Sequence, residues 1–378
     1  MENQNKLTAN ISGFIFELNQ NDHSATLCRT EFIDEEEVTI PDSILYQNKA
    51  YKVCFFDNFL FAYNKNTKTI KFHENAEIEN IQHQAFEWSS ITTIIFPSQI
   101  KQFEQDFELR CDTLKTVIFP ENLKLKNLDV VFEAPIESIN IPKNLISINQ
   151  NMFTKCSNLN QIIISPNNQF FGYLDEDMKL IGKKSDQNQD NFDILIFACR
   201  DIKRAIIPSN IEVINSYSFS DCKKLNSIEF SNNSNLREIK KNAFSRCSIE
   251  NIVIPANVIR LSQKVFDQCY NLKKVEFEEN SKIHSIDKNT FEKTPIKSIL
   301  LPTNVNCVRC NAFLSCSELA CFECLGDDLF FESNCFNNCS HLLIISCPNA
   351  LQIYFDANNN KYLNENCVIY VQNKALIL

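Results

Sequence analysis

The chain has 378 residues, of which 44% are hydrophobic and 22% are charged, a composition that predicts a folded protein and not a disordered one. Its 37 basic and 47 acidic residues give a net charge of −10, which argues against a nucleic-acid binder because such proteins need a basic surface. Only 4 residues are glycine, and their positions form no glycine-rich phosphate loop and no nucleophile elbow.

The first 68 residues contain short strand-like runs, at 13–18, 25–28, 38–40 and 49–53, but lack the phenylalanine phrase that follows. These runs predict β-hairpins that cap the first repeat and cover its exposed edge. The first twelve residues hold no apolar run typical of a secretory signal, and no stretch reaches the length of a membrane span. From sequence alone we therefore expect a cytoplasmic protein.

A phenylalanine phrase recurs along most of the chain. A small or apolar residue precedes Phe, and Cys often stands three positions after it. The phenylalanines are Phe86, Phe107, Phe132, Phe153, Phe219, Phe244, Phe266, Phe291, Phe313 and Phe336. Their spacing is 21 to 25 residues, with one gap of 66, and such a period indicates a solenoid whose units stack side chains in columns. We expect the phrase itself to form short helical or 3₁₀ turns.

A second phrase, apolar-x-x-apolar-x-apolar, follows the phenylalanines and often ends in Pro, as in Ile249 to Pro255. The alternation at its end is that of a half-buried strand, and Pro ends the strand because it lacks the N–H donor. Strands about 4.8 Å apart are then expected to form one long parallel sheet.

An insertion at about 165–206 interrupts the repeats, and we predict an added hairpin because the segment is too short for a core of its own. Residues 349–378 lose the pattern again. The predicted organisation is a hairpin cap at 1–68, a solenoid at 69–348 and a C-terminal cap at 349–378.

The segment Ile254 to Asn280, IPANVIRLSQKVFDQCYNLKKVEFEEN, and its neighbours resemble the BspA-like leucine-rich repeats of bacterial surface antigens and trichomonad proteins. The resemblance implies an α/β solenoid, a leucine-rich repeat (L-domain-like) stack. It would have a parallel sheet on one face, short helical or 3₁₀ turns on the other and an N-terminal β-hairpin cap. It also implies a cell-surface location, in contrast to the cytoplasmic expectation from the missing signal.

Among the 17 cysteines, Cys307-x-x-Cys310 and Cys321-x-x-Cys324 have the spacing of a zinc site. The repeat register places Cys324 inward and Cys321 outward on one strand, so the four sulfurs are not expected to converge. The cysteines of the phenylalanine phrase are instead expected to form a column of small, buried, reduced thiols. They are Cys156, Cys222, Cys247, Cys269, Cys316 and Cys339.

The segment Asp186 to Asn191 resembles the start of a calcium loop, but its sixth position is not Gly and Phe197 stands where Glu is required. A solvated hairpin tip is therefore expected. The five histidines share no spacing that implies a catalytic group. We predict that the chain is not an enzyme and has no metal and no cofactor.

The residue before the last apolar position of each strand phrase should point outward. It is Ile95, Ile118, Asn140, Ile163, Glu229, Val253, Glu276, Leu300 or Glu323 in successive repeats. Such β-branched and aliphatic residues can serve sheet propensity alone, or they can form a row that binds a partner. The predicted partner-binding residues are Ile95, Ile118, Ile163, Glu229, Val253, Glu276 and Leu300.

These features predict a non-catalytic scaffold that recognises a protein partner, with no nucleic acid bound and no membrane-spanning segment. The resemblance implies a surface antigen or adhesin. The alternative is a cytoplasmic structural or assembly scaffold that uses the same face for self-association.

Overall fold

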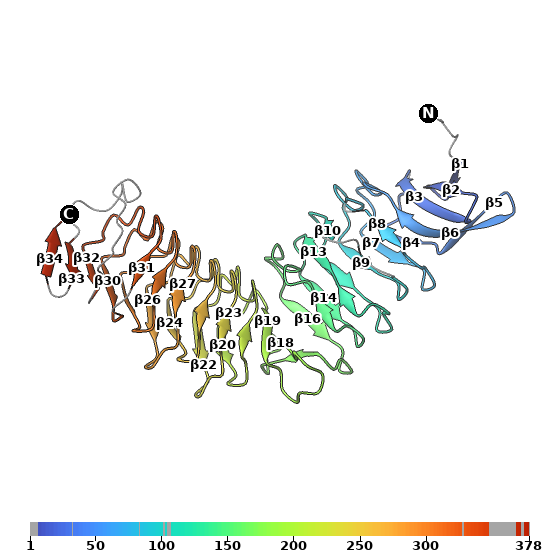
Figure 1. Ribbon diagram of the computed structural model, residues 1–378. Coiled ribbons are helices and arrows are strands. Elements are labelled where there is room, and N and C mark those ends of the chain that lie inside the picture. Colours follow the sequence, from blue (N-terminus) through green and yellow to red (C-terminus); the bar gives the residue numbers. More distant parts are fainter. Residues whose placement is uncertain are drawn as a thin grey trace. The chain divides into compact units, whose positions relative to one another are not determined.

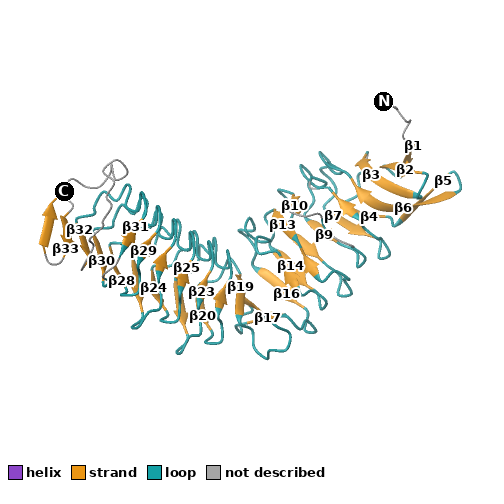
Figure 2. Cartoon of the chain, viewed as in Figure 1, coloured by secondary structure: helices purple, strands orange, loops and turns teal. Residues whose placement is uncertain are grey.

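The computed structural model describes residues 7–31, 33–82, 84–100, 103, 107–326, 329–347, 368–371 and 374–377. The chain divides into two compact units, Met1–Phe171 (unit 1) and Gly172–Leu378 (unit 2). In the described residues all regular structure is β-strand, and the strands are joined by turns and loops (Figure 2).

Unit 1 begins with a mixed β-sheet that forms the N-terminal hairpin cap. The order β1-β2-β3-β6-β5 contains antiparallel pairs at β1–β2, β2–β3 and β5–β6, while β3–β6 is parallel. Gly13, with φ +80°, allows the tight turn between the first two strands, where an added Cβ would lie 2.6 Å from the Glu31 carbonyl oxygen. The strands are β1 (Leu7–Ile11), β2 (Phe14–Asn19), β3 (Ser24–Thr30), β5 (Ser43–Tyr46), β6 (Lys49–Phe56) and β8 (Asn80–Ile81), which pairs with β6.

The main sheet of unit 1 is parallel and has the order β16-β14-β11-β9-β7-β4. Its first strand, β4, lies inside the range 1–68 and pairs with β7, with Glu37 opposite Thr69. The strands are β4 (Glu37–Ile40), β7 (Thr69–Phe72), β9 (Thr93–Ile95), β11 (Thr116–Ile118), β14 (Ser138–Ile141) and β16 (Gln161–Ile164). Two further parallel pairs complete the unit: β10 (Phe107–Arg110) with β13 (Val130–Glu133), and β12 (Asn127–Leu128) with β15 (Ser147–Ile148).

Three phenylalanines of unit 1 differ from the sequence prediction. Phe107 and Phe132 lie in strands β10 and β13 and not in turns, because alternate side chains of both segments are buried. Phe61 was missed, although it is fully buried and stacks on Phe86 with ring centroids 6.4 Å apart. The statement that residues 1–68 lack the phrase is therefore wrong. The polar Thr67 occupies the first apolar position of the strand phrase that follows Phe61, which hid the repeat.

Unit 2 carries two parallel strand ladders, and neighbouring coils stack side by side (Figure 1). The prediction of one long sheet is wrong because the apolar residue five positions before each Phe forms a second, two-residue strand. This short ladder consists of β21 (Val213–Ile214), β23 (Glu238–Ile239), β25 (Arg260–Leu261), β27 (Ser285–Ile286), β29 (Cys307–Val308) and β31 (Phe330–Phe331). It starts from β19 (Ile194–Ala198), which also pairs antiparallel with β18 (Leu180–Lys183), while β17 spans Phe171–Tyr173.

The long strands of unit 2 follow the apolar-x-x-apolar-x-apolar phrase. They pair in parallel as β20–β22, β24–β26 and β28–β30–β32–β33, and the antiparallel pair β33–β34 ends the last sheet. Their bounds are β20 (Arg204–Ile207), β22 (Ser227–Phe230), β24 (Asn251–Ile254), β26 (Lys274–Phe277), β28 (Ser298–Leu301), β30 (Cys321–Cys324), β32 (Ile344–Cys347), β33 (Val368–Val371) and β34 (Lys374–Ile377).

The coils of unit 2 alternate between two kinds, so that the true repeat is a pair of coils. Ile207, Ile254 and Leu301 are 47 residues apart, and each is followed by Pro. The intervening long strands end in Phe230 and Phe277, without Pro. The coils that end at Ile207 and Ile254 are thus each followed by one with a longer, proline-free loop, whereas the coil after Leu301 ends at Cys324 and has a loop as short as that of the coils with Pro.

A phenylalanine column forms the core of unit 2. Phe219, Phe244, Phe266, Phe291, Phe313 and Phe336 are each at most 2% exposed. Successive rings stack with centroid distances of 4.9, 5.6, 5.5, 5.2 and 5.5 Å. The predicted continuous hydrophobic column is therefore present in this unit.

The turns around the column phenylalanines contain no helix or 3₁₀ segment in the described residues, so this part of the prediction is wrong. The physical reason is a left-handed residue on each side of Phe, two positions before it and two after it, which a right-handed helix cannot include. In unit 2 these residues are Tyr217, Asp221, Asn242, Arg246, Lys264, Gln268, Asn289, Lys293, Asn311, Ser315, Asn334 and Asn338.

Candidate functional site

The long strands of unit 2 display an ordered row of outward side chains, here called the strand strip. Each strand of the eBeB type buries its second and fourth residues and exposes the third. Register places Ile206 opposite Glu229, Val253 opposite Glu276, and Leu300 opposite Glu323. An aliphatic residue and a glutamate therefore alternate along six coils of the unit.

The aliphatic members of the strip are unusually accessible for residues of their kind. Ile206, Val253 and Leu300 are 50%, 46% and 47% exposed. Single exposed aliphatics are common on protein surfaces, whereas an ordered row of them indicates a contact surface. The strip is therefore the most coherent apolar feature of this face.

Two glutamates of the strip form ion pairs with neighbouring basic residues. Arg204 lies 3.0 Å from the Glu229 carboxylate, and Lys274 lies 2.7 Å from Glu276. All four side chains are at least half exposed, so these pairs contribute little to folding, about 0–1 kcal/mol each. They leave the strip close to electrically neutral and separate its aliphatic residues with polar ones.

Unit 1 has a less regular strip on its parallel sheet. Ile118 and Ile163 are 37% and 51% exposed, and Ile95 is half-buried. Asn140 interrupts the row, since its side-chain amide donates to the Phe119 carbonyl oxygen at 2.6 Å and its Oδ1 accepts from the Phe119 N–H at 2.7 Å. This residue thus completes backbone hydrogen bonding at the end of β11 and has a structural role.

All seven residues predicted to bind a partner lie on the two strips: Ile95, Ile118 and Ile163 in unit 1, and Glu229, Val253, Glu276 and Leu300 in unit 2. Sequence reasoning missed Ile206, because Ala205 replaces the large apolar residue expected beside it. The signal was the alternation in Ala205-Ile206-Ile207 followed by Pro208.

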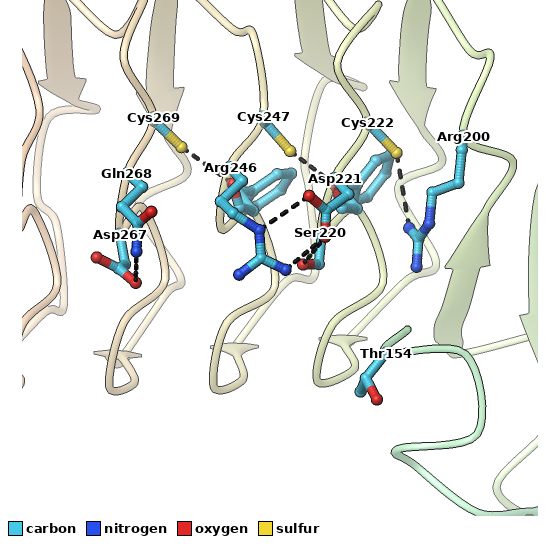
Figure 3. Close-up of polar contacts among 12 residues, drawn as sticks. Thr154, Arg200, Ser220, Asp221, Cys222, Arg246, Cys247, Asp267, Gln268 and Cys269 are labelled. Carbon is cyan, nitrogen blue, oxygen red and sulfur yellow. Dashed lines mark hydrogen bonds and ion pairs between the residues drawn. The ribbon is translucent and has the colours of Figure 1, made fainter. Parts of the chain in front are cut away.

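The predicted thiol column is present, and Figure 3 shows part of it on the phenylalanine side of unit 2. Cys247, Cys269 and Cys316 donate to the carbonyl oxygens of Phe219, Phe244 and Phe291 in the preceding coil, at 2.7, 2.9 and 2.9 Å. Burial raises the pKa of Cys269 to about 12, so this thiol keeps its proton at neutral pH. The column thus links neighbouring coils by hydrogen bonds and offers no reactive thiolate at Cys269.

A polar row beside the thiols joins neighbouring turns. Arg246 forms a two-bonded ion pair with Asp221 of the preceding coil (Figure 3). In the next coil, Gln268 donates to Asp267 Oδ2 at 3.2 Å, while Asp267 Oδ1 is buried without a hydrogen-bond partner. Burial, followed by the charge of Glu292, raises the pKa of Asp267.

The two motifs with possible metal spacing have other contacts. On β30, Cys321 faces Glu323 with the sulfur 3.3 Å from its carboxylate, while Cys324 is buried on the other face. Asp186 accepts the Asn188 N–H at 2.9 Å, which is the hydrogen bond of a turn. Within the residues that the structure describes, no three histidine, cysteine or acidic residues are grouped as a metal site would require.

A search of the described residues for membrane-spanning helices found no helix of sufficient length and apolarity.

A comparison with known protein families agrees with this repeat geometry. The family described as "BspA type Leucine rich repeat region" matches residues 79–174, 194–320 and 282–365 in six copies, which is more than half of the chain. The chain belongs to the BspA-type leucine-rich repeat family. Its members are repeat scaffolds associated with protein interaction, and the recognition made from Ile254 to Asn280 is confirmed. A search of curated proteins found no match.

Solved structures with similar folds are also leucine-rich repeat proteins. The pneumococcal vaccine antigen PcpA aligns with a TM-score of 0.63 at 16% identity, over 97% of this chain and 93% of that chain. A leucine-rich repeat protein from Eubacterium ventriosum gives 0.57 at 16% identity, over 96% and 93%. A leucine-rich cell surface protein from Faecalibacterium prausnitzii gives 0.51 at 18% identity, over 89% and 93%. These likenesses show the solenoid fold.

Proposed function

We propose that this BspA-type repeat protein is a non-catalytic scaffold that recognises another protein through the strand strip. The observation that carries the proposal is the alignment of three half-exposed aliphatic residues, Ile206, Val253 and Leu300, in register on alternate coils. A protein partner buries such a row favourably, at about 25 cal/mol per Å² of apolar surface. Ion-paired glutamates between them would form the polar part of the contact.

The finer proposal is an adhesin or surface antigen. It is supported by the family and by the names of two structural neighbours, one called a cell surface protein and one a vaccine antigen. Labelling of intact cells with a membrane-impermeant reagent tests this role. Labelling before permeabilisation is expected. Labelling only after permeabilisation would favour the alternative of an internal assembly scaffold that associates with itself.

A matched set of triple variants tests the strip. Ile206→Lys, Val253→Lys and Leu300→Lys together should reduce capture of a specific partner at least about tenfold, because three charges would enter the contact. The control triple is Ile259→Lys, Leu325→Lys and Leu343→Lys, which changes similarly exposed aliphatics outside the strip. A third triple, Ile95→Lys, Ile118→Lys and Ile163→Lys, tests the strip of unit 1.

Only proteins that the control triple retains and a strip triple loses count as specific partners. Circular dichroism and thermal unfolding establish that each variant keeps the native fold. If both strip triples capture the same proteins as the unchanged chain, the binding face lies elsewhere and the proposal fails.

A further inference from the structure

Unit 1 carries three aromatic side chains on its turn edge, here called the aromatic turn cluster. Phe59 stacks on Trp88 with centroids 5.1 Å apart and an interplanar angle of 11°, and Tyr63 lies 6.0 Å from Trp88. Tyr63 is 77% exposed and Trp88 is 56% exposed. Backbone hydrogen bonds Phe59 N–H to Gln84 O and Tyr63 N–H to Trp88 O hold the two turns together.

The aromatic turn cluster is not explained by core packing. Phe61 and Phe86 fill the interior of these two coils and are at most 1% exposed. The three aromatics instead occupy the left-handed positions that flank these core residues, with φ of 57°, 65° and 56°. A side chain in this conformation costs about 1–2 kcal/mol. The left-handed conformation recurs at the flanking positions of unit 2, so it is the exposure of the bulky Tyr63 and Trp88 rings that points to a role in binding.

An open hollow of about 470 Å³ lies on the Tyr63 side of the cluster. Thr30, Asn64, Lys65 and Asn66 line it beside the tyrosine ring. Its polar groups are a hydroxyl, two amides and one ammonium, so it offers hydrogen-bond donors and acceptors but a single charge.

A second open hollow, of about 430 Å³, begins at Glu87, the residue next to Trp88. Its charged lining residues are Glu87, Arg110, Asp112, Glu133 and Lys155. Arg110 and Lys155 lie 3.0 and 3.6 Å from the Glu133 carboxylate, so much of this charge is already paired. Glu87 Oε2 is buried without a hydrogen-bond partner, so a ligand in this hollow would meet the exposed carboxylate of Asp112 instead.

The charges around the cluster discriminate between classes of ligand. A polycationic ligand would approach Lys65, Arg110 and Lys155, and a polyanionic one would approach the three carboxylates of the second hollow. A neutral ligand rich in hydroxyl groups meets neither penalty and can bond to amides, carboxylates and guanidinium alike. The flat C–H face of a pyranose also stacks on exposed tryptophan and tyrosine rings.

We propose that the aromatic turn cluster binds a neutral oligosaccharide, with sugar rings stacked on Tyr63 and Trp88. Hydroxyl groups of the sugar bond to exposed side chains that line the two hollows, Lys65 on one side and Asp112 on the other. This site consists of turn residues of unit 1, whereas the proposed protein partner contacts strand residues. The two proposals therefore do not depend on each other.

Tryptophan fluorescence reports directly on this site, because Trp88 is the single tryptophan in the sequence. The full-length protein is titrated with neutral hexasaccharides of glucose, mannose, galactose, xylose and N-acetylglucosamine while acrylamide quenching is measured. At least one hexasaccharide is expected to protect Trp88 from quenching in a saturable manner, because a stacked sugar covers the indole ring.

Two tyrosine variants separate binding from folding. Tyr63→Gly removes one ring and also relieves the left-handed strain, so the fold is expected to persist while affinity for the protecting sugar falls at least about tenfold. Tyr217→Gly is the control, since Tyr217 is a tyrosine at the other kind of left-handed position, two residues before a column phenylalanine of unit 2, with φ 60°. This control should retain the affinity of the unchanged chain.

Three results would overturn the proposal. The first is that no hexasaccharide of the panel protects Trp88. The second is that Tyr63→Gly, still folded by circular dichroism, binds the sugar as well as the unchanged chain. The third is that polylysine or a proline-rich peptide protects Trp88 and the sugars do not, which would assign the cluster to a different class of ligand.

Discussion

The two units use the same repeat but build their cores differently. In unit 2, six column phenylalanines stack without interruption, and coils alternate in a 47-residue double repeat. In unit 1 Phe61 and Phe86 stack in this way, while Phe107 and Phe132 lie in strands. A second set of rings, Phe72, Phe96 and Phe119, stacks near the strand ends instead, at 5.8 and 5.2 Å.

This difference shows that the phenylalanine alone does not determine the turn. A column phenylalanine in unit 2 has a left-handed residue on each side and, in most coils, a cysteine or threonine three positions later. Phe132 has neither, Phe107 has Arg110 three positions later, and the alternating apolar neighbours of both form strands. The regular unit displays an even strip, whereas the irregular unit displays the aromatic turn cluster.

The largest expected effect is on the free energy of unfolding, and it distinguishes the phenylalanine column of unit 2 from the Phe61–Phe86 stack of unit 1. Phe244→Ala should lower the free energy of unfolding of unit 2 by about 3–5 kcal/mol, because the ring is buried between two others and a cavity remains. Phe86→Ala should lower that of unit 1 by less, since the Phe86 and Phe61 centroids are 6.4 Å apart, farther than any successive pair of the unit 2 column. Urea unfolding monitored by circular dichroism measures both changes. A loss below about 1 kcal/mol for Phe244→Ala would show that the column is not the core.

A smaller effect concerns the residue directly after the column phenylalanine, which is Glu87 in unit 1 and Asp267 in unit 2. Asp267→Asn should stabilise unit 2 at pH 7, since burial disfavours the charged carboxylate and the amide is neutral, while the unpartnered position beside Oδ1 stays polar in both chains. The folded-state pKa of Asp267 is raised above 3.8. The unchanged chain therefore becomes less stable as pH rises from about 3.8 through this raised pKa, because the buried carboxyl group must then lose its proton.

The gain from Asp267→Asn should therefore shrink as pH falls and vanish below about pH 3, where the carboxyl is protonated in both states. Denaturant unfolding across this range measures the difference. Glu279→Gln, at an exposed position of the same unit, is the control and should show no such trend. An equal gain at pH 3 and pH 7 would contradict the electrostatic explanation.

The smallest effect tests the left-handed positions themselves. Lys264→Gly, at φ 61°, should stabilise unit 2 by about 0.5–1 kcal/mol, because relief of the left-handed strain exceeds the entropy that glycine loses on folding. Lys288→Gly is the control at an exposed turn position without positive φ, and it should destabilise by about 0.5–1 kcal/mol. If both changes destabilise, the lysine stem makes contacts that outweigh the strain.

The phenylalanine and strand phrases were sufficient to predict the family, the solenoid and the inward and outward faces of the strands. That prediction succeeded because stacked coils need a buried apolar residue at the same place in each repeat, as at Ile252, Phe244 and their equivalents. The regular spacing of such residues is visible in the sequence. The short second ladder was missed because its two-residue strands, such as β23, have too few residues to show an alternation.

The turn geometry was missed because the usual signal, glycine, is absent. A weaker signal was present, since Asn tolerates the left-handed conformation and stands two residues before Phe at Asn242, Asn289, Asn311 and Asn334. The positions after Phe hold Arg246 and Gln268, which carry no such preference. The aromatic turn cluster was overlooked for a related reason. The sequence phrases do not include Phe59, Tyr63 and Trp88, and only the structure shows which of the neighbouring rings face solvent.

The flanking positions hold residues with side chains and not glycine, and this affects how the surface of such a chain can vary. Glycine offers no side chain to vary, whereas several coils of unit 2 carry partly or fully exposed side chains at these sites, for example Lys264 and Gln268, although Asn242 and Asn289 are buried. Mutation at these sites alters the chemistry shown to the surroundings and leaves the buried rings untouched. The chemistry of the turn surface can therefore change by mutation while the solenoid and its phenylalanine column stay the same.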